Sequence, residues 1–595
     1  MFYKNIIFDV DNTLYNYDFC HKKAINSIFY NISNENKCNI DSVEKLYNEI
    51  NKTHKSLTVN TASSHNKYIK IKQLLDKYNM INYDEMHNLY WTTFYKNMNP
   101  FKGVIDFIKW NKSIGIIIGI LTDYETEYQI EKLKRLDLLQ YIDCIVTSEE
   151  IGCEKPSIHA FNYILMKMDA TRHETIMIGD NFKKDIIGSK EAKIYSYYFC
   201  NKPYKINNFF TEFNSFMVLS KKFIEIHNEL NNLKIISRYC GERFDLVQAG
   251  GGNTSVKMND IMFIKASGFN LSDISNHKGY VCIKNKYFLN DLSDNIMKKI
   301  TDYNMCGKLR GSIETYMHSI LKKYTIHLHP IQVNKILVLK NSKSIISKLF
   351  PDSLFIEYIT PGIKVYNEIK KKYNNEDIIF LDNHGVIITT NDFNEIKIII
   401  DKIINKCEVY FNLNYTKYKI TNKISSFIFE KYNEEVITYL SQDITITEYI
   451  KNKLSLFKES IAFPDALIYC GIKIIIGNFK DICKYYGKYK ELPNILIIDN
   501  LLFIVSNSLK KCKEIEDVLK ANLLILDTKE KKQYLSQDEI CFLNNWDSEK
   551  YRKNLKMWEY FKRACKNNFE KGEFSARNYQ YIYNYAFLHI FQFFS

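Results

Sequence analysis

The segment KNIIFDVDNTLYNYD, near the N-terminus, constrains the fold more than any other stretch of this 595-residue chain. It begins with an apolar run typical of a buried strand and continues into two acids, Asp9 and Asp11. Polar groups that follow a buried parallel strand lie at the carboxyl edge of the sheet, where α/β enzymes carry their sites. The segment therefore predicts an α/β domain with carboxylate chemistry at that edge.

Three later stretches place further polar groups at the same edge. The apolar run IGIIIGILTD carries Thr122 at its end, and TIMIGDNFKKD leads from another strand to Asp180 and Asp185. Between them, GCEKPS puts Lys155 just ahead of a helical stretch. A candidate nucleophile, a hydroxyl group, a lysine and an acid pair therefore follow separate strands. The alternative is a Rossmann-like domain whose acids stand there by coincidence.

The motifs DxDxT, Thr, Lys and GDxxxxD, in this order, resemble those of the haloacid dehalogenase superfamily of phosphatases over about residues 1–200. The resemblance implies that Asp9 attacks phosphorus and forms an aspartyl-phosphate, a nucleophilic role open to carboxylates. Asp11 would protonate the leaving oxygen and then activate water. Thr122 and Lys155 would neutralise the phosphoryl oxygens.

The same resemblance implies a Mg²⁺ site, since Mg²⁺ prefers oxygen ligands. The ion would lie between Asp9, the backbone carbonyl of Asp11 and Asp180, while Asp185 would brace the lysine or a water on the ion. A mostly helical, polar segment at about 15–99 matches the cap of the small-molecule branch of the superfamily. A cap that closes over a site excludes water and limits the substrate.

The pattern changes after FCNKPYKINN, and a second group of candidate loops follows. LVQAGGGNTSVK, FIKASGFNLSDI and GSIETYMHSIL each combine glycine with hydroxyl or amide side chains. Backbone N–H groups in such turns can bind an anion, although turns use glycine for other reasons too. The residues of interest in these loops are Gly252, Asn253, Ser267, Gly268, Ser312 and Glu314.

The stretch IHLHP, residues 326–330, places two histidines one residue apart in an apolar run that predicts a strand. Side chains at i and i+2 of a strand lie on the same face, so His327 and His329 would direct two imidazoles to one point. Taken alone, the pair is either part of a metal site or two surface histidines on a half-buried strand. FLDNHGVIIT adds His384 at another strand end.

Taken in order, GGGNTSVK, KASG, HLHP, YITPG and NHGV resemble the class II aldolase/adducin family. The resemblance is closest to its longer, rhamnulose-1-phosphate aldolase-like members; it covers about residues 225–420 and continues more weakly to about 550. It implies an α/β domain with an open catalytic site for Zn²⁺ or another divalent transition metal. The implied ligands are His327, His329 and His384.

By this resemblance, Glu314 is the acid/base of an aldol reaction, and the metal would stabilise the enediolate as a Lewis acid. The substrate phosphate would be held by Gly252, Asn253, Ser267, Gly268 and Ser312. Ile313 stands where many members carry a second serine, which puts strict sugar-1-phosphate specificity in doubt. The family also implies a homotetramer with sites at subunit interfaces and a general-acid tyrosine lent by a neighbour.

These motifs predict an α/β protein of several domains. We expect a Rossmann-like hydrolase domain with a helical cap, an α/β aldolase-type domain, and a smaller α/β C-terminal extension. The expected boundaries are 1–200 for the hydrolase domain, 201–224 for a linker, 225–420 for the aldolase-type domain, 421–550 for the extension and 551–595 for a helical tail.

The composition of the chain indicates which partners and which cell compartment to expect. The net charge of +14 comes from lysines spread along the chain, which favours phosphorylated small molecules and gives no sign of nucleic-acid binding. The 14 cysteines have no zinc-finger spacing and no signal peptide precedes them, so we expect reduced thiols in the cytoplasm. The longest uncharged apolar run, SIGIIIGILT, is too short to span a bilayer, and no membrane role is expected.

The hypothesis that unites these observations is a bifunctional enzyme of sugar-phosphate metabolism. A Mg²⁺-dependent phosphatase would be joined to a zinc-type aldolase acting on a phosphorylated ketose. With the same metal, the second domain could instead be an epimerase, a dehydratase or a decarboxylase. A non-catalytic, adducin-like interaction module is the alternative from another class of protein.

Overall fold

The computed structural model describes residues 3–59, 61–207, 209–285 and 309–545. The chain divides into two compact units, Met1–Tyr415 and Thr416–Ser595. In the part of the chain described, the first unit contains two seven-stranded sheets and the second a four-stranded sheet. The predicted α/β class is therefore confirmed. The helical tail expected at 551–595 lies outside the described residues.

The first sheet has the strand order β3-β2-β1-β4-β5-β7-β6, and all neighbours are parallel except β6 and β7. The chain moves to one side of β1 for β2 and to the other for β4, which makes the carboxyl end of β1 a topological switch point. The strands are β1 Asn5–Phe8, β2 Ile117–Thr122, β3 Cys144–Thr147, β4 Thr175–Gly179, β5 Tyr195–Phe199, β6 Lys205–Ile206 and β7 Phe210–Phe213.

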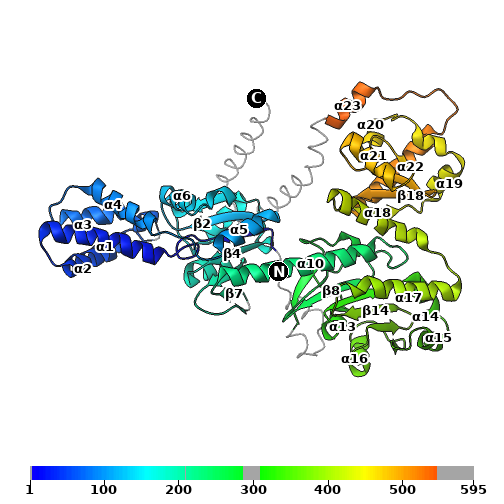
Figure 1. Ribbon diagram of the computed structural model, residues 1–595, viewed down its shortest axis with the longest axis horizontal. Coiled ribbons are helices and arrows are strands. Elements are labelled where there is room, and N and C mark those ends of the chain that lie inside the picture. The colour runs from blue at the N-terminus through cyan, green and yellow to red at the C-terminus, as the bar shows by residue number, and fades with distance from the viewer. Residues whose placement is uncertain (1–2, 60, 208, 286–308, 546–595) are drawn as a thin grey trace, which may run out of the picture. The chain divides into compact units, whose positions relative to one another are not determined.

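Four helices between β1 and β2 form the cap, drawn in blue in Figure 1. They pack on one another through buried side chains such as Ile28, Leu74 and Tyr90. An asparagine side chain caps the N-terminus of α1, of α2 and of α3. The cap helices are α1 Tyr17–Asn36, α2 Ile40–Leu57, α3 Lys67–Asp76 and α4 Tyr83–Lys96. Helices that flank the sheet include α5 Val104–Ser113, α6 Thr126–Arg135, α7 Ser148–Ile151, α8 Ile158–Lys167 and α9 Gly188–Glu191.

Residues 201–224, expected to be a linker, contain β6, β7 and the start of the long helix α10, Phe216–Gly241. Strand β7 pairs with β5, so the first sheet extends beyond residue 200. Phe216 and Phe223 at the start of α10 belong to the apolar core of the first sheet. Leu230 and Leu233, further along the same helix, belong to the core of the second sheet. One continuous helix therefore contributes to both cores.

The second sheet has the order β10-β9-β8-β11-β14-β13-β12, and its neighbours are antiparallel except β12 and β13. Alternate side chains of its strands enter two different cores: Val386 and Ile388 lie on one face, and Ile387 on the other. The strands are β8 Asn253–Met258, β9 Ile261–Lys265, β10 Tyr280–Lys284, β11 Tyr324–Leu328, β12 Leu354–Ile356, β13 Ile378–Leu381 and β14 Gly385–Thr390.

Helices cover both faces of the second sheet, so the domain has three layers. Helices α10, α14 and α17 contribute side chains to the first of its two cores, and α13 and α16 to the second. Labels in Figure 1 mark these helices beside β8 and β14. Their bounds are α13 Thr315–Ile320, α14 Ile331–Leu337, α15 Ser342–Leu349, α16 Ile363–Lys372 and α17 Glu395–Phe411.

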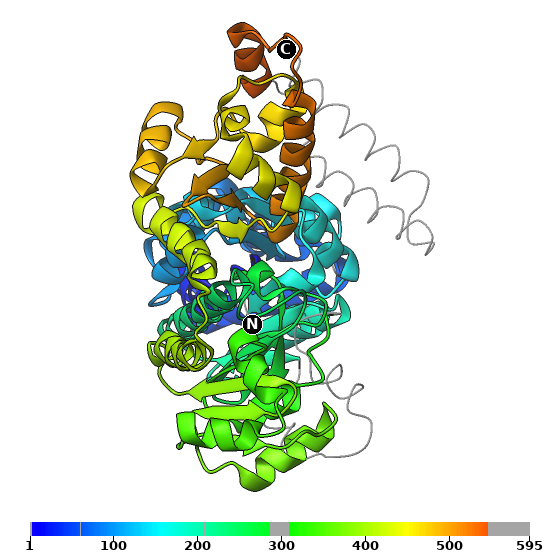
Figure 2. The same ribbon diagram turned by 90° about the vertical axis from the view of Figure 1, so that its right-hand side faces the viewer.

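The second unit is a smaller α/β domain, drawn in yellow and orange in Figures 1 and 2. Its sheet has the order β15-β18-β17-β16, with β15 Ile437–Leu440, β16 Ile475–Ile476, β17 Ile495–Ile498 and β18 Leu501–Ser506. Its helices include α18 Thr416–Tyr432, α19 Ile444–Asn452, α20 Pro464–Cys470, α21 Phe479–Tyr489, α22 Leu509–Leu526 and α23 Gln537–Asn545. Among all helices described, none is long and apolar enough to cross a membrane.

Candidate active sites

The first candidate site lies at the carboxyl edge of the first sheet, as predicted from the sequence. Asp9 follows β1, Thr122 ends β2 and Asp180 follows β4, and these three strands are neighbours with β1 in the middle. The backbone N–H of Asp9 donates to the carbonyl of Ile178 at 3.0 Å, which continues the pairing of β1 with β4 up to the site. The topology therefore brings together residues that are more than 100 positions apart.

Lys155 joins the two acidic sides of this site. Its Nζ donates to Asp9 Oδ1 at 2.6 Å and to Asp185 Oδ1 at 2.7 Å, and all three side chains are buried. The backbone N–H of Asn181 donates to Asp185 Oδ2 at 2.9 Å, which fixes the second oxygen of that carboxylate. Asp185 thus holds Lys155 against Asp9, consistent with the predicted brace.

Thr13, the last residue of DxDxT, completes the connection between β1 and β4. Its hydroxyl donates to Asp180 Oδ1 at 3.0 Å and accepts from the backbone N–H of Asp180 at 3.1 Å. It lies 3.4 Å from Asp9 Oδ2. The motif pointed to this threonine, but the sequence alone assigned no role to it.

The acids of this site repel one another in a buried setting. Burial raises the pKa of Asp9 well above its usual value, and Asp185 and Asp180 raise it further, although Lys155 opposes them. Burial and Asp185 raise the pKa of Asp180 to about 6. Burial alone would lower the pKa of Lys155, but Asp185 and Asp9 keep it well above the usual lysine value.

A divalent cation would relieve this repulsion. Asp9, Asp180 and Asp185 each offer an oxygen, and the three lie within 4.8 Å of one another. An all-oxygen donor set of this kind suits Mg²⁺. The residues present therefore fit the ion that the sequence implied.

Asp11 turns away from these acids and toward a group of donors that the sequence did not reveal. Lys132 Nζ lies 2.9 and 3.0 Å from its two carboxylate oxygens, and Gln129 Nε2 donates at 3.1 Å. The hydroxyl of Tyr15 donates to it as well. Although burial alone would raise the pKa of Asp11, Lys132 and these hydrogen bonds lower it. Lys132 and Gln129 lie on α6, ten and seven residues beyond Thr122, where no motif marks them.

The loop between α2 and α3 of the cap contacts two acids of the core. Asn66 donates to Glu125, which immediately precedes α6. Ser64 Oγ and His65 Nε2 lie 3.2 and 2.9 Å from Oε1 of Glu154, the residue that immediately precedes Lys155 in the sequence. Residues of the cap thus contact the segments that carry the polar groups of the first site.

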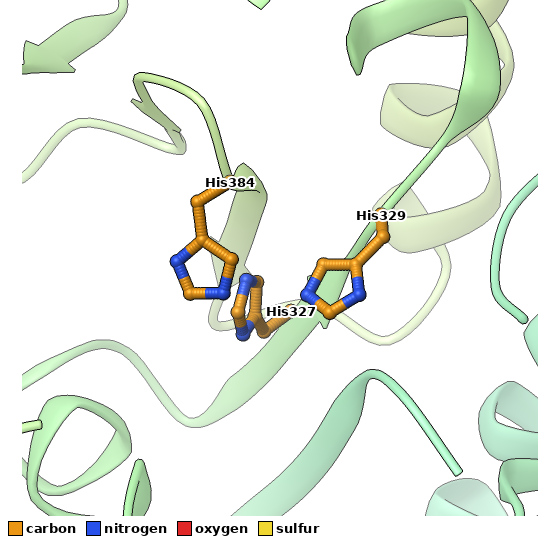
Figure 3. A group of neighbouring side chains, drawn as sticks. All are labelled: His327, His329 and His384. Carbon is orange, nitrogen blue, oxygen red and sulfur yellow. The ribbon is translucent and has the colours of Figure 1, made fainter. Parts of the chain in front are cut away.

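The second candidate site lies where β8, β11 and β14 run side by side. His327, in β11, is opposite Asn253 of β8 and Ile387 of β14. His329 follows the end of β11, and His384 immediately precedes β14. Figure 3 shows the three imidazole rings pointing toward one another, and their centroids are 4.8 to 5.2 Å apart. The strand predicted from IHLHP is confirmed as far as Leu328.

The donor chemistry of the three histidines fits a divalent transition metal. Each ring offers one nitrogen atom as a ligand, and these three nitrogen atoms lie within 4.8 Å of one another. The Nε2 atoms of His327 and His329 are buried and have no hydrogen-bond partner among the described residues. Burial and the neighbouring histidines lower the pKa of His329 to about 4, and burial and His327 lower that of His384 to about 4. Both rings are therefore neutral near pH 7, the form that binds metal.

Glu314 lies directly beside the histidines. Its Oε2 is 3.0 Å from His327 Nδ1 and accepts from Asn253 Nδ2, and its Oε1 is 3.7 Å from His384 Nε2. Burial alone would raise its pKa, but His327 and the other histidines lower it well below the usual value, so Glu314 is ionised. A carboxylate on one ring nitrogen of His327 orients the other nitrogen for a metal.

Glycines leave the space that His329 occupies. A Cβ atom on Gly385 would lie 2.9 Å from its Cδ2, and one on Gly251 would lie 3.1 Å from its Nδ1. A larger residue at either position would force the ring or the neighbouring backbone to shift. The three-glycine turn before β8 therefore positions a histidine, in addition to the anion-binding role considered from the sequence.

The structure brings several of the expected phosphate-binding residues together. Asn253 Nδ2 donates to Ser312 Oγ at 3.2 Å, and Ala266 forms a bridge with Gly311, so Ser267 and Gly268 lie beside the same loop. The backbone N–H of Ser267 is already bonded to the carbonyl of Arg310 at 2.7 Å. Gly252, with φ of +71°, lies against the carbonyl of His327. Ile313, whose side chain has no hydrogen-bonding group, is 45% exposed at this loop.

The two folds and their polar groups define a hydrolase-type domain followed by an aldolase-type domain. Residues 6–198 match the family model described as Haloacid dehalogenase-like hydrolase, and residues 236–411 match Class II Aldolase and Adducin N-terminal domain. The chain therefore belongs to the haloacid dehalogenase-like hydrolases and carries a second domain of the class II aldolase and adducin family. It is an enzyme, a hydrolase with an aldolase-type domain.

Curated relatives match the first domain. A glyceraldehyde 3-phosphate phosphatase of Methanocaldococcus jannaschii is 32% identical over 201 residues, which cover 32% of this chain and 81% of the relative. A ribulose-1,5-bisphosphate 5-phosphatase of Halopiger xanaduensis is 29% identical over 195 residues, covering 31% and 79%. The solved N-terminal class II aldolase domain of a conserved Thermoplasma acidophilum protein is 24% identical and covers 31% of this chain and 93% of its own, with a TM-score of 0.29.

Proposed function

We propose that the protein is a bifunctional enzyme of sugar-phosphate metabolism. The first domain hydrolyses a phosphomonoester through an aspartyl-phosphate, and the second cleaves or forms a carbon–carbon bond in a phosphorylated ketose. The observation that supports the phosphatase most strongly is the position of Lys155, which lies between Asp9 and Asp185 at hydrogen-bonding distance from both. A positively charged group beside a candidate nucleophile is where the phosphoryl oxygens of a substrate would bind.

The phosphatase reaction proceeds in two steps. A carboxylate oxygen of Asp9 attacks phosphorus, the bond to the leaving oxygen breaks, and Asp11 gives that oxygen a proton. Although burial alone would raise the pKa of Asp11, Lys132 lowers it in the free enzyme, so this step requires that Asp11 takes up a proton when the substrate binds. Asp11 then takes a proton from water, whose oxygen attacks the same phosphorus and releases phosphate and the Asp9 carboxylate. Lys155 and Thr122 stabilise the charge on the phosphoryl oxygens, and Thr13 holds Asp180 in place. Mg²⁺, held by Asp9, Asp180 and the carbonyl of Asp11, with Asp185 nearby, supplies further charge neutralisation when bound.

The second reaction depends on Glu314 as the proton-transfer group. Its ionised carboxylate removes a proton from the carbon next to a ketone, or from the hydroxyl group of the substrate in the cleavage direction. Asn253 and His327 fix the orientation of the carboxylate. Zn²⁺ or another divalent transition metal on His327, His329 and His384 supplies Lewis-acid stabilisation of the enediolate when bound. The loops with Gly252, Asn253, Ser267, Gly268 and Ser312 hold the phosphate of the ketose.

The substrate class follows from the relatives and from the pairing of the domains. Both curated relatives are phosphatases whose names specify phosphorylated sugars or trioses. The name of the Halopiger xanaduensis relative specifies a bisphosphate, and that of the Methanocaldococcus jannaschii relative a monophosphate. Because aldol addition is reversible, removal of phosphate from its product would draw the reaction toward synthesis. We further propose that the enzyme works in the cytoplasm as a homotetramer, with no nucleic acid or membrane among its partners.

A screen of sugar phosphates for phosphate release and for retro-aldol cleavage tests both activities with wild-type protein. The proposal predicts phosphate release that requires Mg²⁺ and ketose cleavage that survives its removal. Release of phosphate without cleavage of any ketose would favour an epimerase, a dehydratase or a decarboxylase in the second domain. Purified protein without a transition metal in that domain would instead favour an adducin-like interaction module.

A further inference from the structure

A group of basic side chains lies next to Asp11, and all of them are buried except the half-buried His21. We call His21, Lys67, Lys70 and Lys132 the cap-side basic cluster. Lys132 comes from α6 of the core and forms the ion pair with Asp11. His21 comes from α1, and Lys67 and Lys70 from α3, so the other members belong to the cap.

Three members of the cluster converge on one aromatic ring. The Nζ atoms of Lys67 and Lys132 lie 5.8 and 5.2 Å from the centroid of the Tyr17 ring. His21 stacks on the same ring, with centroids 5.7 Å apart. Two lysines from different elements thus approach each other over Tyr17, although their like charges repel.

The positive charge of the cluster is only partly balanced. Lys67 is 6% exposed, and its ammonium makes no ion pair or hydrogen bond with any described residue. Burial, Lys70, Lys55 and Lys132 lower the pKa of Lys67 well below its usual value, although Asp11 opposes them. Lys70 donates to the carbonyl of Ser64 at 2.6 Å, and Glu125, an acid that raises the pKa of Lys70 against the effect of burial, already accepts from Asn66.

A buried amine without an anionic partner is held below its usual pKa, and an anion beside it would restore its positive charge. Such a group is therefore expected to meet an anion in the functional complex. The scissile phosphoryl group would lie between Asp9, Thr122 and Lys155. Because Asp11 protonates the leaving oxygen, the rest of the substrate extends from Asp11 toward Lys132 and Lys67. The cluster therefore faces the leaving group and not the phosphoryl group that is transferred.

We propose that the phosphatase substrate carries a second anionic group, a phosphate or a carboxylate, on its leaving-group portion, and that Lys67 and Lys132 bind it. This inference rests on the phosphatase proposed above and specifies its substrate class. Tyr17 supplies the surface on which the two ammonium groups are held. Lys67, contributed by the cap, then makes closure of the cap sensitive to the charge of the substrate.

Two matched pairs of substrates test the inference with wild-type enzyme and Mg²⁺. Ribulose 1,5-bisphosphate and ribulose 5-phosphate differ by a second phosphate, and 3-phosphoglycerate and glyceraldehyde 3-phosphate differ by a carboxylate in place of an aldehyde. We expect kcat/KM to favour the doubly anionic member of at least one pair by about tenfold or more, the scale of one charge-assisted hydrogen bond. The pair that shows the preference identifies phosphate or carboxylate as the second anion.

Equal kcat/KM within both pairs would overturn the inference while leaving the phosphatase proposal intact. Hydrolysis of none of the four compounds, and of no aryl phosphate, would overturn both. The preference is measured on the wild type, so it does not depend on how a variant folds.

Variants on one helix then test the role of Lys67. Lys67→Gln should lower the preference for the doubly anionic substrate by about tenfold, and Lys67→Arg should restore part of it. The matched control is Lys72→Gln on the same helix, because Lys72 is 46% exposed and paired with Asp76 at 2.6 Å. It should leave the preference unchanged. A Lys67→Gln protein with the wild-type preference would show that Lys67 does not bind the second anion.

Discussion

The two candidate sites use different donors because different sheets carry them. In the first site, parallel strands β2, β1 and β4 end side by side and present carboxylates and a threonine, and the segment between α7 and α8 adds Lys155. In the second, three histidines lie in or next to antiparallel strands β11 and β14, and Glu314 comes from the start of α13. Oxygen donors suit Mg²⁺ and phosphoryl transfer, whereas neutral imidazoles suit a transition metal and carbonyl chemistry.

The two sites balance their charges in different ways. Acids crowd one another in the first site, so Lys155 and a cation must balance them. In the second site the rings of His329 and His384 are neutral near pH 7, and Glu314 is ionised. We therefore expect that each site can be disabled without loss of the other.

The largest effect is expected for Asp9→Asn. Loss of the nucleophile should reduce hydrolysis of an aryl phosphate by more than ~10³-fold, because only binding and charge stabilisation would remain. Cleavage of a ketose phosphate by the second domain should be unchanged. Asp169→Asn, at an exposed position in the same domain, is the control and should keep full activity. Near-normal turnover by Asp9→Asn would end the assignment of the nucleophile.

Glu314→Gln should produce the next largest effect, confined to the second domain. Loss of proton transfer should reduce ketose cleavage by about 10²–10⁴-fold, whereas the three histidines keep their metal. Metal content and activity measured on the same preparation separate these properties. Glu314→Gln protein that lost its metal would mean that the glutamate acts as a ligand and not as the acid/base.

A smaller effect is expected where the cap meets the core. Although burial alone would raise the pKa of Glu154, its contacts with His65 and Lys184 lower the pKa to about 2. The folded pKa thus lies below the unfolded value of about 4.5. The stabilisation is complete above about pH 4.5 and is lost as pH falls toward 2. Amide protection factors in the loop at 62–66 should fall by about tenfold between pH 5 and pH 3.

Glu154→Gln provides the control for this pH dependence, since it cannot ionise. Its protection factors in the same loop should be lower at pH 5 and should change much less between the two pH values. A wild-type loop whose protection is equal at pH 5 and pH 3 would show that Glu154 does not hold the cap loop.

The sequence predicted most of the groups that lie at strand ends. Asp9, Thr122, Asp180 and the histidine pair each follow or occupy a strand whose apolar run is plain, and neighbouring strands bring them together. Lys132 was missed because it lies within a helix, where one basic residue among several carries no signal. Its contact with Asp11 spans 121 positions and depends on how α6 packs.

The region after residue 200 shows a second limit of the sequence. β7 has only four residues, Phe210–Phe213, so its apolar pattern is too short to distinguish a strand from a loop. The structure pairs it with β5 and lets α10 contribute to two cores. The contacts of the cap loop with Glu125 and Glu154 likewise arise from tertiary packing and have no local pattern.

Elemental analysis of three proteins tests most directly the claim that two independent metal sites exist. Wild type, His329→Ala and Asp180→Asn would be loaded with Zn²⁺ and Mg²⁺, freed of excess ion and measured in parallel. We predict one tightly held transition metal per chain in wild type and in Asp180→Asn, and none in His329→Ala, which should still release phosphate from an aryl ester. Equal transition-metal content in wild type and His329→Ala would contradict the account, because the histidines of IHLHP would then serve only as part of a strand.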